Sequence, residues 1–308
     1  MVFELTILGS SSALPTSQRY PSAHVLNVHE RFFLIDCGEG TQMQLRRYRI
    51  KFGRIHHIFI SHLHGDHVFG LYGLLSTMSL SGRESPLRLY APASFREILF
   101  THLADFDIHL NFDIDFVGLQ GKDPVKIFED KKLSVLSLPL KHRVPAYGFL
   151  FREKARERNI IKEAIDKYNI PVSEIHKIKK GADFLSPEGI VIPNREISTD
   201  PPRQRSFAYC SDTAYFKRLA DFVRDVDLLY HEATFASESA ELAAKTGHST
   251  SGQAAMTALD AGVGRLVIGH FSARYRDTDP LLDEAKRTFP DTIAAEEGSV
   301  IKIGSKQH

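Results

Sequence analysis

Residues 58–67 read IFISHLHGDH, an apolar run followed by three histidines and an aspartate within six residues. His62 and His64 are two positions apart, so on extended chain their side chains point to the same side. A glycine then permits a sharp turn that aims Asp66 and His67 at a second point close by. Four donors exceed the three protein ligands of an open catalytic zinc site. The motif therefore predicts ligands divided between two metal ions.

Three further donors follow apolar runs that are typical of strands. His142 ends LSVLSLPLKH, Asp212 lies in SFAYCSDT, and His270 ends RLVIGH. In α/β proteins, ligands gather just beyond the carboxyl ends of strands, so we expect these side chains to join the first motif. Seven donors would then serve two ions. A carboxylate has two oxygens and can bridge, which makes Asp212 the candidate shared ligand.

Two other segments carry possible acid–base groups. LLYHEATF presents His231 and Glu232 after a strand, and a histidine paired with a glutamate is typical of an oriented general acid. TGHSTS presents His248 before a helix, where it is either a functional group or an exposed neighbour of the helix cap. Other histidines have no convergent partners and are interpreted as structural or surface residues: His56, His57, His102, His109 and His176.

Short apolar runs alternate with helical patterns along the chain, which predicts a layered α/β architecture. The expected strands are Glu4–Leu8, His24–Val28, Arg31–Ile35, His57–Ile60, Leu87–Tyr90, Leu133–Leu138, Ser206–Tyr209, Leu228–Tyr230, Arg265–Ile268 and Val300–Ile303. The expected helices are Gly40–Arg46, Val68–Ser79, Ala93–Thr101, Tyr215–Arg224, Ser251–Ala261 and Asp279–Thr288. The helix at Ser251 follows Ser and Thr residues that favour an N-cap.

The composition is that of a soluble globular protein. The 308 residues are 43% hydrophobic and 25% charged, and no apolar run approaches the roughly 20 residues of a membrane span. The start, MVFELTILGS, lacks the charged region and cleavage site of a signal peptide, so we expect a first strand and a cytoplasmic protein. Cys37 and Cys210 form no CxxC pair and are interpreted as buried, reduced thiols.

Residues 151–203 do not follow the α/β rhythm and are predicted to form an insertion within a single domain that spans residues 1–308. Ile161, Ala164, Ile165 and Tyr168 have the spacing of an amphipathic helix. The net charge of the chain is only +1, yet residues 141–180 hold 11 Lys and Arg against 5 Asp and Glu, a local excess of 11 − 5 = 6. This asymmetry indicates either a segment that binds a polyanion or a solvated charged face. The best cationic cluster is Lys177, Lys179 and Lys180.

The motifs SHLHGDH, LKH, CSDT, HEATF, HST and HFSARY occur in the order and context of a known family. The chain resembles the metallo-β-lactamase superfamily and, within it, the short form of the ribonuclease Z family, the tRNA 3′-end endonucleases. The resemblance covers nearly the whole chain and implies a four-layer α/β/β/α sandwich with the metals at one edge.

The resemblance also implies roles for individual residues. His62, His64 and His142 would hold one zinc ion, Asp66, His67 and His270 a second, and Asp212 would bridge them. Asp66 would also accept a proton, His248 steered by Glu232 would protonate the leaving oxygen, and Arg274 would face a substrate phosphate. Attack of a metal-activated hydroxide on the phosphodiester would remove the 3′ trailer from a tRNA precursor and leave a 3′-hydroxyl.

The insertion at 151–203 would be the protruding arm with which this family grips the tRNA body, and family members are typically homodimers. The chain departs from the family pattern in two places. The arm segment NIPVSEIHKIKKG lacks a Gly-Pro pair, and LPTSQRYPSAH keeps Pro15 and Arg19 but has Tyr20 where an asparagine is usual.

Two other interpretations stay open. One is a different dinuclear hydrolase, either a small phosphodiesterase or a thioester hydrolase of the glyoxalase II kind. The other is an RNA-binding protein with structural metals, although structural zinc sites favour closed Cys/His sets and this set is rich in aspartate. The histidine-rich ligands suit two Zn²⁺ ions, and mixed nitrogen and oxygen sites also accept Mn²⁺.

Overall fold

The computed structural model describes residues 1–304, and the chain divides into two compact units. The core unit comprises Met1–Phe128, Val135–Phe151 and the chain from Arg205 onward. The arm unit comprises Glu129–Ser134 and Arg152–Gln204, a division that lies close to the insertion predicted at 151–203. Among the described residues, no helix is both long enough and apolar enough to cross a membrane.

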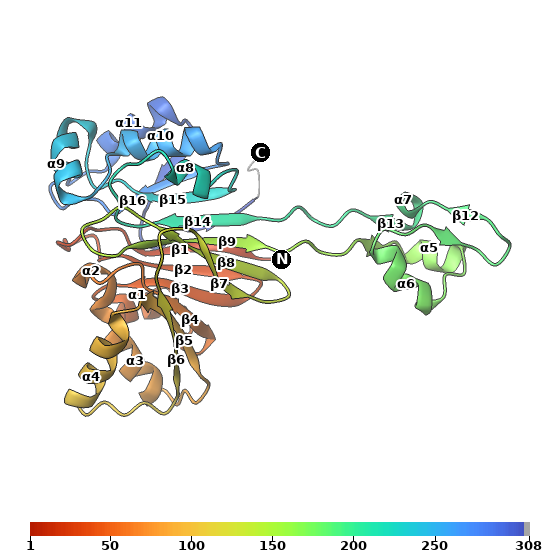
Figure 1. Ribbon diagram of the computed structural model, residues 1–308, viewed down its shortest axis with the longest axis horizontal. Helices are drawn as coiled ribbons and strands as arrows, with labels where there is room; N and C mark the ends of the chain where they lie inside the picture. The colour runs from red at the N-terminus through yellow and green to blue at the C-terminus, as the bar shows by residue number, and fades with distance from the viewer. Residues whose placement is uncertain (305–308) are drawn as a thin grey trace. The chain divides into compact units, whose positions relative to one another are not determined.

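Two seven-stranded sheets form the middle layers of the described chain (Figure 1). The first sheet has the order β18 (Val300–Lys302), β1 (Phe3–Gly9), β2 (Ala23–Val28), β3 (Arg31–Cys37), β4 (Ile55–Phe59), β5 (Leu87–Pro92) and β6 (Ile114–Leu119). The second has the order β17 (Thr292–Ala294), β16 (Leu266–Gly269), β15 (Leu228–Glu232), β14 (Ser206–Cys210), β9 (Tyr147–Glu153), β8 (Leu133–Pro139) and β7 (Val125–Glu129). In each sheet one half is parallel: β3 to β6 in the first and β14 to β17 in the second.

Helices cover the outer face of each sheet, as Figure 1 shows. The first sheet carries α1 (Thr41–Arg47), α2 (Gly65–Val68), α3 (Gly70–Leu80) and α4 (Phe95–Asp105). The second carries α8 (Leu219–Phe222), α9 (Ala240–Thr246), α10 (Ser251–Ala261) and α11 (Asp279–Thr288). The prediction of a four-layer α/β/β/α sandwich is therefore confirmed.

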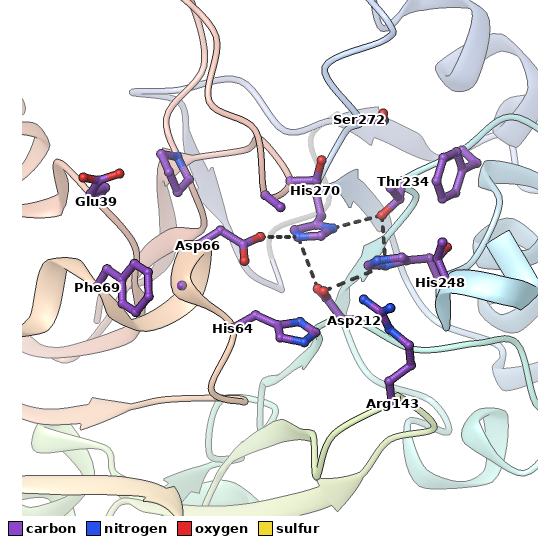
Figure 2. Close-up of a pocket in the computed structure, with 16 residues that line it drawn as sticks. Glu39, His64, Asp66, Phe69, Arg143, Asp212, Thr234, His248, His270 and Ser272 are labelled. Carbon is purple, nitrogen blue, oxygen red and sulfur yellow. Dashed lines mark hydrogen bonds and ion pairs between the residues drawn. The ribbon is translucent and has the colours of Figure 1, made fainter. Parts of the chain in front are cut away.

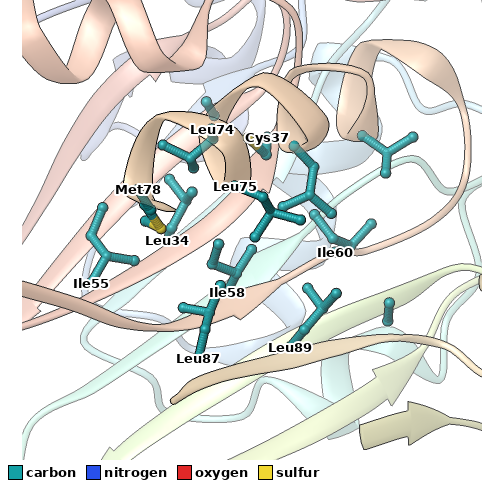
Figure 3. Packing of buried hydrophobic residues seen from close by; sticks show 14 of the residues in the cluster. Leu34, Cys37, Ile55, Ile58, Ile60, Leu74, Leu75, Met78, Leu87 and Leu89 are labelled. Atoms are coloured by element: carbon teal, nitrogen blue, oxygen red, sulfur yellow. The ribbon is translucent and has the colours of Figure 1, made fainter. Parts of the chain in front are cut away.

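Two apolar contacts hold these layers together. Beneath α3, Leu74, Leu75 and Met78 pack onto strand residues that include Ile58 and Leu89, and all five side chains are buried (Figure 3). Between the sheets, aromatic rings meet edge to face: Phe59 with Phe149 at 5.2 Å and Phe33 with Phe151 at 5.8 Å between ring centroids. Because both sheets are covered on both sides, their strands are apolar on both faces, as the sequence indicated.

Some elements differ from the sequence-based expectations. The helix expected at Tyr215–Arg224 is only α8, Leu219–Phe222. Ala214 donates its N–H to the backbone oxygen of Lys141, so the chain before α8 is tied to a neighbouring loop and stays irregular. The expected N-cap of α10 is confirmed: Thr250 caps it in a reciprocal capping box with Gln253. The sequence indicated no strand at β6, β7, β9 or β17 and no helix at α9.

The arm unit has a small core of its own. Its elements are β10 (Asn159–Ile160), α5 (Lys162–Lys167), α6 (Val172–Lys179), β11 (Phe184–Leu185), β12 (Val191–Ile192), α7 (Asn194–Ile197) and β13 (Ser198–Thr199). Ile178 and Ile197 are fully buried there. The amphipathic helix expected from the spacing of Ile161 to Tyr168 is present as α5, which ends at Lys167. Pro171 is the N-cap residue of α6.

Candidate metal centre

The predicted ligands lie beyond strand ends at one edge of the core unit, and all but His142 follow strands of the parallel halves. His62 and His64 follow β4, and α2 presents Asp66 and His67 one turn later. His142, Asp212 and His270 follow β8, β14 and β16. Distant strand ends therefore converge, as expected for ligands of an α/β sheet.

The first group of converging donors consists of His62, His64, His142 and Asp212, whose candidate ligand atoms all lie within 4.8 Å of one another. His62 Nε2 lies 3.1 Å from His64 Nδ1, which in turn lies 3.3 Å from His142 Nε2. His142 Nδ1 lies 2.7 Å from the backbone oxygen of Gly247 and so carries the N–H of its neutral ring, which leaves a lone pair on Nε2 facing His64. That donor set fits a cation.

The second group consists of Asp66, His67 and His270, again within 4.8 Å. Asp212 lies between the groups. Its Oδ2 is 3.4 Å from His62 Nε2, and its Oδ1 is 3.3 Å from His67 Nε2 and 3.2 Å from His270 Nε2. One carboxylate oxygen thus faces each group, which is the arrangement required of a bridging ligand.

Burial and charge keep five of these donors, His62, His64, His142, Asp66 and Asp212, in forms that bind metals. Burial lowers the pKa of His62 and His142, and it lowers the pKa of His64 to about 4, helped by the neighbouring imidazoles. Neutral histidine keeps the lone pair that a metal needs. Burial would raise the pKa of Asp66 and Asp212, but the surrounding histidines outweigh it and hold both pKa values below the usual range.

Outer hydrogen bonds orient the rings. His67 Nδ1 lies 2.8 Å from Asp36 Oδ2, His142 Nδ1 lies 2.7 Å from the backbone oxygen of Gly247, and His270 Nδ1 lies 2.9 Å from Thr234 Oγ1. Each contact engages the nitrogen that points away from the cluster and leaves Nε2 facing inwards.

Sequence reasoning missed Asp36 and Thr234. Asp36 had the same signal as the ligands, because it ends the apolar run FFLID of β3. Its buried carboxylate accepts hydrogen bonds from Ser61 and from the Tyr209 hydroxyl. Burial would raise its pKa, but the contacts with His67 and Ser61 lower it instead.

His248, which is half-buried, pairs with the fully buried Glu232 beside the clusters. His248 Nδ1 lies 3.0 Å from Glu232 Oε1, and the side chain of His248 is 13% exposed. The backbone N–H groups of Thr213, Thr234 and Ser249 all donate to the Glu232 carboxylate. Burial would lower the pKa of His248, but Glu232 and Asp212 outweigh it and raise the pKa to about 9.

Two histidines, His248 and His231, lie close to Glu232 in the structure or in the sequence, and only one of them pairs with its carboxylate. His248 also belongs to a possible donor group with Asp212 and His270. Its Nδ1 is closer to Glu232 than to Asp212, 3.0 Å against 3.8 Å, so the contact with Glu232 dominates. His231 lies elsewhere: it is fully buried, and its Nδ1 contacts the backbone oxygen of Glu232. The glutamate therefore pairs with His248 and not with its neighbour in sequence.

Four of the donors, His64, Asp66, Asp212 and His270, line a pocket of about 520 Å³ together with Arg143 and Phe69 (Figure 2). Phe235 belongs to the same lining. Arg274 is exposed, and its guanidinium lies 5.1 Å from the centroid of the Phe235 ring. Arg274 therefore contacts the pocket-lining residue Phe235 but does not line the pocket itself. Its contact with a substrate phosphate stays a prediction.

The cationic residues predicted in the arm have different surroundings. Lys177 Nζ pairs with Glu174 Oε1 at 2.8 Å within α6. Lys179 is half-buried, and Lys180 is exposed. Lys177 and Lys179 lie in the last turn of α6 and Lys180 is its C-cap residue, so the three side chains start from one end of this helix.

Comparisons with known proteins match most of the chain. A model described as beta-lactamase superfamily domain matches residues 199–271, and one described as anti-Pycsar protein Apyc1 matches residues 3–109. Ribonuclease Z of Bacteroides thetaiotaomicron is 48% identical over 303 residues, which cover 98% of this chain and 96% of that protein. Ribonuclease Z of Porphyromonas gingivalis is 44% identical over 295 residues, or 96% of this chain and 97% of that protein.

Solved structures show the same likeness. The crystal structure of human tRNase Z, short form, has a TM-score of 0.72 and 28% identity, and the match covers 98% of this chain and 100% of that chain. The metallo-beta-lactamase fold protein YhfI from Bacillus subtilis has a TM-score of 0.71 at 20% identity, over 98% of this chain and 100% of that chain.

Proposed function

The chain belongs to the ribonuclease Z family, and on this premise we propose that it is a metal-dependent endoribonuclease that removes the 3′ trailer from tRNA precursors. The observation that carries the proposal is the position of Asp212, whose two carboxylate oxygens face separate groups of histidines in one pocket. Two-metal sites of this kind suit hydrolysis of phosphodiesters.

We propose two Zn²⁺ ions per chain, with Mn²⁺ as an alternative occupant. His62, His64 and His142 would bind one ion, Asp66, His67 and His270 the other, and Asp212 both. The support is the donor set itself, which is rich in imidazole and contains no thiolate. When bound, the ions supply an activated water nucleophile and neutralise negative charge on the phosphoryl oxygens.

The residues of the chain supply the proton transfers. Asp66, held ionised by its histidine neighbours, would accept a proton from the attacking water. His248 would donate a proton to the leaving 3′-oxygen, which produces the 3′-hydroxyl of the tRNA. Glu232 outweighs burial and raises the pKa of His248, which favours the protonated ring that a proton donor needs. Glu232 would fix the orientation of the ring and stabilise its positive charge.

The arm would bind the body of the tRNA through Lys177, Lys179 and Lys180. Double-stranded RNA is recognised by its shape and its phosphates, so such contacts give affinity without reading bases. They also explain how a chain with a net charge of +1 could bind a polyanion. We also propose that the protein is cytoplasmic and that it forms a homodimer.

Incubation of the protein with a precursor tRNA, and mapping of the cleaved end, tests the function. We expect one cut that leaves a 3′-hydroxyl on the tRNA and that a chelator abolishes. The variant Asp212→Ala should be inactive, while Asp260→Ala, a change at an exposed position of α10, should match the unmodified protein. Turnover of a chromogenic phosphodiester with no cleavage of tRNA precursors would instead favour a small phosphodiesterase.

A further inference from the structure

Arg143 is a cation with a defined place in the pocket and no partner. Among the described residues that line the pocket, it is the one arginine or lysine. It is exposed, and no hydrogen bond or ion pair engages its guanidinium within the described chain. Its stem lies against the His248 loop, since a Cβ placed on Gly247 would be 3.6 Å from Arg143 Cγ.

Phe69 presents an exposed ring to the same pocket. It is 63% exposed, although it lines the pocket beside Asp66. One part of its ring packs on the backbone of Gly65, where a Cβ would lie only 2.3 Å from the ring. Figure 2 shows Phe69 and Arg143 on opposite sides of the group formed by His64, Asp66 and Asp212. The pocket therefore has an aromatic side and a cationic side.

From this asymmetry, and resting on the proposed function, we propose a direction for the RNA strand. The end of the tRNA lies over Arg143, which contacts the phosphate immediately 5′ of the last tRNA nucleotide, the nucleotide that carries the leaving 3′-oxygen. The first trailer nucleotide lies over Phe69, which stacks on its base. Both contacts are sequence-independent, because every nucleotide has a phosphate and every base has an aromatic face.

The position of His248 sets the direction. His248 follows Gly247, against which Arg143 packs, so the proton donor and the cation share one side of the pocket. The leaving 3′-oxygen belongs to the tRNA and must lie beside its proton donor. The remaining tRNA strand therefore starts on the side of Arg143. On the other side, Glu39 also lines the pocket, and its negative charge disfavours a phosphate and leaves the ring of Phe69 for a base.

The test crosses two protein variants with two modified substrates. One precursor carries a methylphosphonate in place of the phosphate 5′ of the last tRNA nucleotide, and its scissile phosphate is unchanged. The other carries an abasic first trailer nucleotide. We expect Arg143→Gln to lower kcat/KM about 10- to 100-fold, mainly through KM, and Arg143→Lys to lose less. We expect Phe69→Ala to lower kcat/KM about 5- to 100-fold and Phe69→Trp to lose little.

The couplings between variant and substrate decide the matter. The methylphosphonate should cost the unmodified protein about as much as Arg143→Gln does, and it should cost that variant nothing more. The abasic nucleotide should show the same non-additivity with Phe69→Ala. Additive losses in both pairs, or the reverse pairing of variant and substrate, would overturn the proposed direction.

Controls separate this inference from the proposed function. Arg287→Gln in α11 and Phe106→Ala after α4 change exposed residues outside the pocket lining and should leave kcat/KM unchanged. Because the modified substrates also test the unmodified protein, a variant that fails to fold does not remove the test. If the unmodified protein cuts no tRNA precursor, both proposals fail. If it cuts correctly but shows no coupling, only the strand direction fails.

Discussion

Asp36 Oδ2 lies 2.8 Å from Nδ1 of His67, and both side chains are fully buried. The contact fixes which nitrogen of His67 faces the pocket. Burial alone would lower the pKa of His67, but Asp66, Asp212 and Asp36 outweigh it and raise the pKa well above its ordinary value. A metal bound at Nε2 must displace a proton that these carboxylates favour, so metal binding should release protons.

Replacement of Asp36 by Asn should weaken binding at the second metal group. The amide keeps the size of the side chain but removes its charge, so His67 loses the partner that orients it and increases its basicity. We expect a loss of about 10- to 100-fold in affinity for one of two ions. Calorimetric titration of the metal-free protein with Zn²⁺ measures the affinity for each ion, with Asp260→Asn as the control at an exposed position. Equal affinities in both variants would mean that Asp36 only fills space.

Asp212 and His248 should differ in what their loss does. We expect His248→Ala to lower the single-turnover cleavage rate by about 10² to 10⁴ with metal content unchanged, since only a proton donor is lost. Asp212→Ala should lower the rate further and should also lower metal content. Elemental analysis beside the kinetics separates the two, with the exposed His109→Gln as control. Equal rate losses at full metal occupancy would contradict these assignments.

Glu297 should give the fold a pH dependence. Its carboxylate accepts hydrogen bonds from the Tyr20 backbone and from Gln44. Burial nevertheless raises its pKa from 4.5 to about 7. The folded chain therefore holds this proton more tightly than the unfolded chain does. The resulting stability is complete below pH 4.5 and is lost as the pH rises through 7.

Unfolding by denaturant at pH 5 and pH 8 measures this effect in the unmodified protein and in Glu297→Gln, which cannot titrate. Between these pH values we expect the unmodified protein to lose about 1–2 kcal/mol relative to the variant, after allowance for solvent screening. A difference that does not change with pH would show that Glu297 titrates normally.

Deletion of residues 155–198, with a short flexible link in their place, should separate binding from chemistry. We expect the affinity for precursor tRNA to fall at least roughly tenfold and its salt dependence to weaken, because phosphate contacts are lost. Hydrolysis of a chromogenic phosphodiester should be unchanged. If turnover of that small substrate fell as far as tRNA binding did, the arm unit would be needed for the fold of the core.

The sequence predicted the parts of the site that have local signals. SHLHGDH places four donors in six residues, and the other donors end apolar runs, so the layered fold and the convergence of His142, Asp212 and His270 could be anticipated. Asp36 carried the same signal but was not recognised. The edge strands β6 and β7 were missed because their residues are mostly half-buried or exposed, which weakens an apolar pattern.

Other features depend on contacts that no local pattern contains. The choice of His248 over His231 as the partner of Glu232 follows from the loop that brings residue 248 beside β15. The free guanidinium of Arg143 and the exposed ring of Phe69 became visible only when their neighbours in space were known. Burial and pairing are properties of the folded chain, so a single sequence does not reveal them.

The most direct test of two ions sharing Asp212 is a metal titration of the apo-protein in which cleavage of a precursor tRNA is followed at each step. We expect full activity only when about two equivalents are bound, and we expect Asp212→Ala to remain inactive at any metal concentration. Full activity at one equivalent, or cleavage in excess chelator, would contradict the two-ion site.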